Sequence, residues 1–461
     1  MKYLFALVFV SILSLNLLFA QQSERIIIEG NSLVGKVIND ENVREVIGNV
    51  VMTQGEVRIT CNKAIQYLSR NEAKLIGNVV AVQDTITVYA ERAYYYGESK
   101  FTYSDTTVTL NDGHVTLVAD TGYYYFDDDR AEFFNNVHLI DSANTLESNQ
   151  LFYYNNIDKA VCIGDVRIYD DKSEIKSDSL LHYRNDDLSF AYSNIMISYP
   201  DNRAIITGGY LEDRGLEKYT YIDENPVLTQ IDTSESGIID TMIIVSKKME
   251  AFQDSSNRFI ASDSVEIVRG DFFSVNNYSI FYREEDKIVT HKRSDDEPQP
   301  IMWYDNSQLT GDSITVITKD NEIDWIDISG SSFIMSKIEN YDNRFNQISG
   351  KRIKMYFRNG DLQKTEVFGN VLSYYYLFED ETANGLLKSS SEDAILLFKD
   401  NSISDVKLYR SIKSEYHPEN IITGKEREFT LPSFIIHKNK PDKNSILRSI
   451  SNFVKNNGAF N

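Results

Sequence analysis

The stretch IGNVVMTQ occupies residues 47–54, and IGNVVAVQ occupies residues 76–83, an interval of 29 residues. Each copy is followed by a run in which polar and apolar residues alternate and which ends in tyrosine. A phrase that returns at a fixed interval is typical of a chain built from repeated supersecondary units. These two copies therefore raise the question of how far the repeat extends.

Two columns of residues show that the repeat is genuine. The first column is polar, with Val or Ile following each member: Asn49, Asn78, Thr107, Asn136, Asp165 and Asn194. The second column contains only tyrosine: Tyr67, Tyr96, Tyr125, Tyr154 and Tyr183. With 29 tyrosines in 461 residues, five matches in one column have a chance probability well below roughly one in a thousand.

Four further columns are uniform in chemistry. One is aliphatic: Ile59, Val88, Leu117, Leu146 and Ile175. One is small: Cys61, Ala90, Ala119, Ser148 and Ser177. One is polar: Asn62, Glu91, Asp120, Asn149 and Asp178. One is large and apolar: Ile65, Tyr94, Tyr123, Phe152 and Leu181. Because side chains alternate along a strand, we expect positions 59, 61, 65 and 67 to share one buried face.

The repeat must fold back on itself, since 29 extended residues would reach roughly 95 Å. Turn residues occur at Gly48–Asn49, Gln54–Gly55 and Ser69–Asn71 in the first copy. We therefore expect two or three strands in each repeat, and stacked copies that bury a continuous apolar seam. The five aliphatic residues should then stack on one inner sheet face.

The pattern divides the chain into five parts. They are a signal peptide (1–20), a first repeat lobe (41–215), a linker or insertion (216–240), a second and weaker repeat lobe (241–410) and a polar C-terminal tail (411–461). Residues 1–20 have a lysine, a short apolar core and a final Ala20, which indicates export rather than a membrane span. In the tail, Ile446 and Ile450 fit one stripe of a short helix, and a frayed end fits equally well.

Charge and cysteine content limit the possible partners. A formal net charge of −22 argues against nucleic acid, which binds basic surfaces, and against adsorption to anionic lipid head groups. The two cysteines, Cys61 and Cys162, are too few for a disulfide framework. Their different positions in the repeat predict two free thiols.

The repeats resemble the OstA/LptA-like family of organic-solvent-tolerance and lipopolysaccharide-transport proteins. GNV opens the repeat at 48–50, 77–79 and 369–371. A small–polar–x–x–apolar–x–Tyr phrase follows as CNKAIQY (61–67), AERAYYY (90–96), ADTGYYY (119–125), SNQLFYY (148–154) and SDSLLHY (177–183). The resemblance covers about 45–210 well and 260–400 more loosely. It implies an all-β fold, a repeat-built antiparallel β-jellyroll or β-taco, here with two lobes.

The resemblance also implies a function. Such proteins hold lipopolysaccharide acyl chains in an apolar interior and join edge to edge into a periplasmic bridge for outer-membrane biogenesis. The expected partners are thus lipopolysaccharide or a related glycolipid, and other jellyroll proteins of the bridge that pair through strand edges. The expected location is the periplasm, with possible association with the outer membrane. Neither a cofactor nor a metal is expected.

The columns suit a lipid track, although they also suit a plain core. Large aliphatic residues make walls and the small column leaves room, so the aliphatic, small and large-apolar columns are the candidate lipid contacts. In the alternative interpretation, the same residues pack against the opposite sheet and leave no groove. The tyrosine column is predicted to be a structural aromatic ladder. The polar column is expected to satisfy backbone groups, since one oxygen ligand per repeat is too few for a calcium ladder.

Catalysis has little support in the sequence. The six histidines share no column, and neither G-x-S-x-G, H-E-x-x-H nor a phosphate-binding glycine loop is present. We therefore expect a protein that is not an enzyme. The second hypothesis for function is a secreted or cell-surface β-repeat protein that binds or adheres without transporting lipid. A parallel β-helix enzyme acting on polysaccharide is a more distant third.

Overall fold

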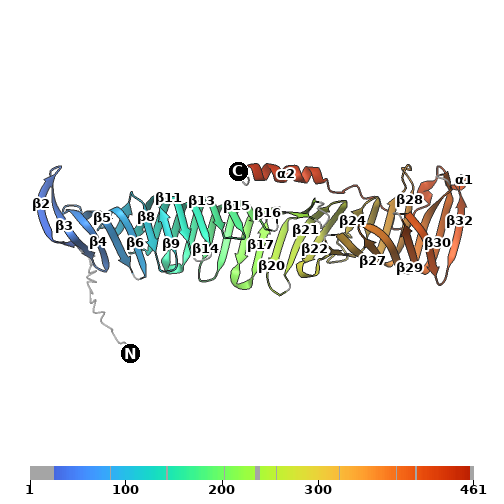
Figure 1. Cartoon of the computed structure of the whole chain (residues 1–461), viewed down its shortest axis with the longest axis horizontal. Coiled ribbons are helices and arrows are strands. Elements are labelled where there is room, and N and C mark those ends of the chain that lie inside the picture. The colour runs from blue at the N-terminus through green and yellow to red at the C-terminus, as the bar shows by residue number, and fades with distance from the viewer. Residues whose placement is uncertain are drawn as a thin grey trace, which may run out of the picture. The chain divides into compact units, whose positions relative to one another are not determined.

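The structure is a computed structural model that describes residues 25–83, 85–141, 144–201, 203–233, 239–255, 257–320, 322–379, 382–399 and 402–456. The predicted signal peptide, residues 1–20, lies outside these residues. The chain divides into two compact units, Met1–Asn135 and Asn136–Asn461. Within each unit, long strands lie side by side in chain order (Figure 1).

Unit 1 consists of strands. They are β1 (Ile27–Glu29), β2 (Ser32–Ile38), β3 (Glu41–Gln54), β4 (Val57–Tyr67), β5 (Glu72–Gln83), β6 (Ile86–Tyr96), β7 (Phe101–Ser104), β8 (Val108–Asn111), β9 (Thr116–Ala119), β10 (Thr121–Tyr125) and the first part of β11 (Arg130–Ile140).

Unit 2 repeats the same plan over a longer stretch. Its first strands are β12 (Thr145–Tyr154), β13 (Lys159–Tyr169), β14 (Glu174–Tyr183), β15 (Leu188–Tyr199), β16 (Ala204–Arg214), β17 (Tyr219–Asp223), β18 (Val227–Thr233), β19 (Ile239–Val245), β20 (Lys248–Phe252), β21 (Arg258–Arg269) and β22 (Phe272–Tyr282). These are followed by β23 (Lys287–His291), β24 (Ile301–Tyr304), β25 (Ser307–Thr310), β26 (Ser313–Lys319), β27 (Glu322–Lys337), β28 (Phe345–Arg358), β29 (Asp361–Glu379), β30 (Thr382–Lys399), β31 (Ser402–Tyr409) and β32 (Lys413–Pro418).

Helices are short and few among the described residues. Unit 2 has the single 3₁₀ turns η1 (Asn155–Ile157), η2 (Gly215–Glu217), η3 (Arg283–Glu285) and η4 (Glu426–Glu428), with helices α1 (Glu419–Ile422) and α2 (Lys443–Asn456). Helix α2 confirms the helical alternative for the end of the tail. No described helix has the length and apolar character needed to cross a membrane.

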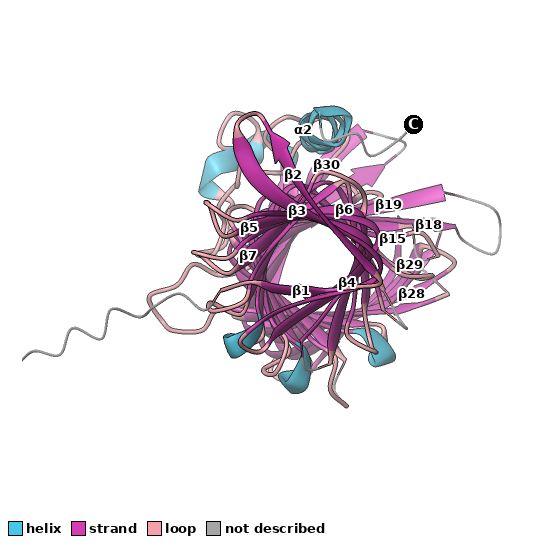
Figure 2. Cartoon of the chain, turned by 90° about the vertical axis from the view of Figure 1, so that its left-hand side faces the viewer, coloured by secondary structure: helices cyan, strands magenta, loops and turns pink. Residues whose placement is uncertain are grey.

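Successive strands pair antiparallel through tight turns, which gives two long strands per repeat in the first part of unit 1. The β3–β4 hairpin closes at Gln54 and Val57, and the β5–β6 hairpin closes at Gln83 and Ile86. The predicted fold class is therefore confirmed as all-β and antiparallel. Figure 2 views unit 1 from its N-terminal edge, where β3 and β4 curve around one interior.

The GN of the repeated phrase is a bulge in the middle of a strand, not a hairpin turn. Gly48 and Asn49 lie within β3 and both have positive φ, +81° and +47°. The register shifts there, between Ile47 and Val50. Glycine and asparagine tolerate this left-handed backbone better than other residues, which explains why the phrase uses them. A bulge of this kind bends the strand.

The same two-residue bulge recurs along the chain. Pairs with positive φ occur at Gly77–Asn78, Gly164–Asp165, Ser193–Asn194, Asp263–Ser264, Gly330–Ser331 and Gly369–Asn370. At each of them the strand register shifts. Each bulge divides its strand into two halves, and the halves form two walls that face each other across the interior. We call the halves that contain Ile59 and Ile334 wall A, and those that contain Ala64 and Met355 wall B.

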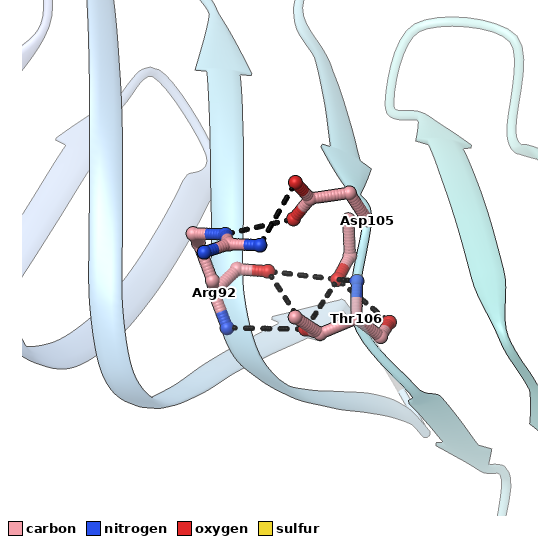
Figure 3. A network of polar contacts seen from close by, with 4 residues as sticks. Arg92, Asp105 and Thr106 are labelled. Atoms are coloured by element: carbon pink, nitrogen blue, oxygen red, sulfur yellow. Dashed lines mark hydrogen bonds and ion pairs between the residues drawn. The ribbon is translucent and has the colours of Figure 1, made fainter.

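One repeat makes this corner without such a bulge pair. Where the other repeats have the bulge pair, β7 and β8 are separated by Asp105–Thr107. Arg92 on the adjacent strand donates from Nε and Nη2 to the two Asp105 carboxylate oxygens at 2.8 and 2.9 Å (Figure 3). The Arg92 backbone N–H donates to Thr106 Oγ1 at 3.3 Å. Side-chain hydrogen bonds therefore secure this corner.

The bulge corrects the predicted face of half the strand. Ile59, Cys61, Ala64 and Gln66 are buried, whereas Ile65 and Tyr67 are only half-buried. Between Cys61 and Ala64, two consecutive residues point away from the interior, so the alternation changes phase. Placing Ile65 and Tyr67 on the face of Ile59 was therefore wrong, because period two holds only within each wall.

Two further segments of unit 2 differ from the expected organisation. Residues 216–240, expected as a linker or insertion, contain β17 and β18, both of which pair with β16. In the polar tail, Ile422 and Leu431 are buried against Phe333, Met335 and other residues of β27–β30 on the face opposite the interior. The tail stays in place partly through Arg344, which donates to Glu419 at 2.6 Å and to Glu426 at 3.3 Å.

Candidate functional site

The aliphatic column lies on one row of wall A in unit 1. Ile59 pairs with Ala81, Ala81 with Val88, Val88 with Leu110, and Leu110 with Leu117. Ile59 and Leu117 are buried, and Val88 is half-buried. In unit 2, Leu146 and Ile175 both pair with Ile168 on the intervening strand β13. Within each unit, these residues therefore stack in register, with one strand between neighbouring members.

The small column lies at the bend between the two walls. Cys61 pairs with Val50, while Ala90 and Ala119 both pair with Val108. In unit 2, Ser177 pairs with Val166. Ser148 and Ser177 are buried, and each hydroxyl donates to the backbone carbonyl two residues later at 3.1 Å. Small side chains here let valines fit inside the bend. Cys61 and Cys162 are both free and buried.

The interior of unit 1 is almost completely filled. The cavity beside Ile59, Ala90 and Ala93 has a volume of about 20 Å³, which is room for no more than a water molecule. Tyr95 is fully buried and donates to Gln54 Oε1 at 2.6 Å. Gln54 Nε2 in turn donates to the Gly97 carbonyl at 2.9 Å, which ties the rim of wall A to the rim of wall B. As it stands, this interior has no space for an acyl chain beside Ala90.

The tyrosine and large-apolar columns lie on the outer face of wall B. Tyr67, Tyr96, Tyr125, Tyr154 and Tyr183 are all half-buried there. Phe101 stacks between Tyr96 and Tyr125 at 4.5 and 5.4 Å. In unit 2, the Lys159 ammonium lies 5.7 Å from the Tyr154 ring and 5.8 Å from the Tyr183 ring. The tyrosines of the column are therefore separated by aromatic rings and cations from the strands that lie between them.

The large-apolar column therefore does not point into the interior. Ile65, Tyr94, Tyr123, Phe152 and Leu181 are half-buried on the outer face, and Tyr103 stacks with Tyr94 at 6.0 Å and with Tyr123 at 4.7 Å. The inward positions belong to the residues one place earlier: Ala64, Ala93, Gly122, Leu151 and Leu180. This corrects the expected orientation of five candidate residues, and its cause is the change of phase at the bulge.

A large cavity lies instead within unit 2, between the walls formed by β19–β31. Its volume is about 780 Å³, which is within the usual range for ligand pockets. Wall A contributes Ile267, Ile334, Ile348, Ser373 and Tyr375, and wall B contributes Ile288, Val316, Met355, Leu396 and Phe398. These strands fold as the others do, with inward side chains separated by outward ones. The result is an apolar groove rather than a filled core.

Polar residues gather along the rims of the cavity. Wall A ends in Arg269, Asp271, Asp305 and Lys337, and wall B has Glu322. The Ser307 and Ser336 hydroxyls, which also line the cavity, lie 2.7 Å apart. The rim therefore carries both signs of charge around an apolar floor. An amphipathic ligand fits this arrangement, with its apolar part inside and its polar part at the rim.

Tyr304 makes contacts across the mouth of this groove, from wall A to wall B, and we call these contacts a clasp. The Tyr304 hydroxyl donates to the Gly360 carbonyl at 2.7 Å, and the tyrosine ring meets Phe357 edge-on at 5.3 Å. Gly360 follows Asn359 in the β28–β29 turn, where both residues have positive φ, as a tight hairpin requires. Burial, together with nearby Asp305 and Asp271, raises the pKa of Tyr304. The hydroxyl therefore remains a donor at neutral pH.

A polar stretch of wall B precedes the cavity in unit 2. His182 Nδ1 and Ser189 Oγ lie 3.0 Å apart, and Thr220 Oγ1 donates to Asp213 at 2.6 Å. Burial lowers the pKa of His182 and raises that of Asp213. A hydrolytic triad would need the carboxylate on the histidine, whereas Asp213 accepts from Thr220. The described residues also contain no group of three or more His, Cys, Asp or Glu side chains placed to hold a metal ion.

The fold and the groove define a class of protein: an antiparallel β-jellyroll, bent at recurrent bulges around an apolar interior. Residues 23–178 match the model of the OstA-like protein family. The resemblance to OstA-like proteins is therefore confirmed over this part of the chain. None of the curated proteins matches the chain.

One similar solved structure is the crystal structure of LptH from Pseudomonas aeruginosa. It is described as the LptA-homologous periplasmic component of the conserved lipopolysaccharide transport device. Its sequence is 18% identical, the match covers 28% of this chain and 76% of LptH, and the TM-score is 0.14.

The sequence analysis named no residue of the 780 Å³ cavity. Weaker repeats were recognised over 241–410, but the candidate contacts came only from the aliphatic, small and large-apolar columns, which end at Leu181. The GNV phrase at 369–371 was the available signal, because it predicts a bulge at Gly369–Asn370 and hence an inward Val371. The distance between the walls is a tertiary property, and no local pattern reports it.

Proposed function

We propose that this protein is a periplasmic component of lipopolysaccharide transport in outer-membrane biogenesis, and that it holds lipid acyl chains in an apolar β-groove. The cavity of about 780 Å³ in unit 2 carries the proposal. The OstA-like match over residues 23–178 supports the same class of function. The ligand we propose is lipopolysaccharide or a related glycolipid.

The chemistry of the groove suits acyl chains. An acyl chain binds by leaving water, at roughly 0.8 kcal/mol for each buried methylene. It needs continuous apolar surface, which Ile267, Ile334 and Ile348 offer on one wall, and Ile288 and Met355 offer on the other. Charged groups are confined to the rim, where a polar head group would remain in water. No catalytic step is part of this proposal.

The proposal extends to unit 1 under one condition. The candidate contacts Ile59, Ala90 and Ala119 border a filled interior, so an acyl chain could reach them only after the Gln54 hydrogen bonds across the rims break. Each of those bonds is buried. Unit 1 would therefore accept lipid at a greater free-energy cost than unit 2, whose cavity is already open.

Strand edges are the proposed contacts with other jellyroll proteins of a bridge. In unit 1, β2 pairs with β3 and exposes Leu33 and Val37, at 57% and 67% of their surface. In unit 2, β31 and β32 both pair with β30 and expose Val406 and Tyr416. Exposed strands with apolar side chains are suited to pairing with a further strand. Export to the periplasm would depend on residues 1–20.

Lipid crosslinking with a matched pair of variants tests the proposal. A photoreactive amino acid replaces Ile348, and the full-length protein is incubated with lipopolysaccharide and irradiated. We expect a crosslinked product that Ser373→Trp removes, because Ser373 lines the cavity and tryptophan would fill it. Leu372→Trp is the control, since Leu372 points outward from the same strand and is 40% exposed. No crosslink in the parent protein, or equal crosslinking in both variants, would contradict the proposal.

A further inference from the structure

On wall B, the groove in unit 2 ends at β23, on the side nearer the N-terminus of the unit. Ile288 lines the cavity, and its register partner on the preceding strand is Phe281. Phe281 in turn pairs with Phe259, and the two ring centroids lie 5.5 Å apart at an interplanar angle of 57°. Phe259 and Phe281 are only 3% and 8% exposed. Two large rings thus occupy the next two positions along the row that forms the floor of wall B.

On wall A, the lining of the cavity continues past this level, through Ile267 of β21 to Met242 of β19. Ile244 and Ile267 are register partners, and each is 1% exposed. On wall B, Met249 and Ala261, one row closer to the bend than Phe259, are also paired and buried. Phe259, Phe281 and these neighbours are therefore packed on wall B, whereas Ile348, Tyr375 and Phe398 are half-buried around the hollow. Along wall B, the lining of the cavity therefore ends at Ile288 of β23.

The opposite end of the cavity is open. Strand β31 supplies Ile403, Val406 and Leu408 to the lining, and Val406 is 50% exposed. The wall B row runs from Ile288 through Val316, Ile326, Met355, Thr365 and Leu396 to Val406. Six strand spacings along this row give a length of about 29 Å. The groove is therefore a pocket with one open end and one closed end.

We propose that Phe259 and Phe281 form the closed end of an acyl-chain pocket and set the longest chain that it accepts. This inference rests on the proposed function, because it assumes that acyl chains are the ligand. A chain that enters beside Val406 gains apolar contact with every methylene until its terminal methyl group reaches the rings. Longer chains must leave their remaining methylenes in water. The two phenylalanines thus determine specificity for chain length.

Affinities for a homologous series of saturated fatty acids, from decanoic to octacosanoic acid, test the inference. For the full-length protein, we expect the Kd to fall about fourfold with each added methylene and then to become constant at one chain length. In Phe281→Ala, this plateau should move to longer chains, because removing the ring extends the pocket. Phe273→Ala makes the same chemical change on the outer side of the same strand, under Lys440, and should leave the plateau in place.

A second variant guards against a failure of Phe281→Ala to fold. Ile288→Phe adds a ring on the cavity side of the closed end, so the plateau should move to shorter chains. An unchanged plateau in the folded variants would overturn the inference. No binding of any fatty acid by the parent protein would instead refute the proposed function. The two failures are therefore distinguishable in one set of titrations.

Discussion

The interiors of the two units are built by the same rules and yet one is filled and the other is hollow. In unit 1, small residues such as Ala93 and Gly122 are inward, and Tyr95 closes the rim from within, leaving a void of about 20 Å³. In unit 2, β19–β31 present larger inward residues along both walls, and about 780 Å³ stays empty. Inward side-chain size alone does not decide the space inside a β-jellyroll, because large residues can hold the walls apart.

Truncating a buried side chain should give the largest difference in stability between the two units. Leu75 is fully buried in unit 1 between Ala64 and Ala93, so Leu75→Ala should lower the free energy of unfolding of unit 1 by about 2–5 kcal/mol. Ile348→Ala in unit 2 removes a half-buried side chain beside existing empty space, and we expect a loss of about 1 kcal/mol. Hydrogen exchange resolved by peptide reports each unit separately. Equal losses would refute the contrast.

Adding a ring should also destabilise unit 1 more than unit 2. Ala119→Phe overpacks the bend of unit 1, where Ala119 is buried against Val108, and should cost about 1–3 kcal/mol. Ser373→Phe places the same ring into the unit 2 cavity and should change stability by about 0.5 kcal/mol or less. Thermal melting followed by peptide-resolved hydrogen exchange compares the two. If unit 1 of Ala119→Phe has the same melting temperature as unit 1 of the parent protein, its interior can accommodate the added ring and the contrast is refuted.

The two rim clasps offer a smaller effect. Tyr95→Phe removes a donor to the buried Gln54 carboxamide, so we expect unit 1 to lose about 1–3 kcal/mol. Tyr304→Phe removes a hydrogen bond from a more accessible rim, and about 0.5–1.5 kcal/mol should be lost. Tyr304→Phe should also speed the exchange of fatty acids in unit 2, measured by stopped-flow displacement of a fluorescent fatty acid. Unchanged exchange would mean that this clasp does not restrict entry.

The weakest expected effect is the acid sensitivity of the tail on unit 2. Hydrogen bonds from Arg344 lower the pKa of Glu419 below its ordinary value of 4.5. A lowered pKa means that the contact contributes fully above about pH 4.5 and is lost as the pH falls through the folded value. Glu419 is partly exposed, so we expect no more than about 1 kcal/mol. Proteolysis of residues 419–437 should increase in acid, and Glu419→Gln should show the same increase at neutral pH.

The sequence predicted the walls better than it predicted the space between them. The Ile59 and Cys61 columns identified inward positions of wall A, since period two holds from residue 57 to residue 61. Ile65 and Tyr94 were placed on the wrong face because that period breaks at Asn62–Lys63, opposite Gly48–Asn49. Two consecutive residues that favour positive φ were a readable signal of this break. The cavity was not readable, because Ile348 and Met355 reveal their separation only in the folded chain.

The paired left-handed residues in mid-strand also govern how such a chain can grow. Each bulge sends one strand into both walls, so a duplicated hairpin would lengthen both walls together, by two strand spacings or about 9.6 Å. The cross-section would not change, and neither would the register of neighbouring strands. A one-residue insertion on one side of a bulge would instead reverse the faces of one wall half. Gene duplication can therefore extend this architecture in whole increments.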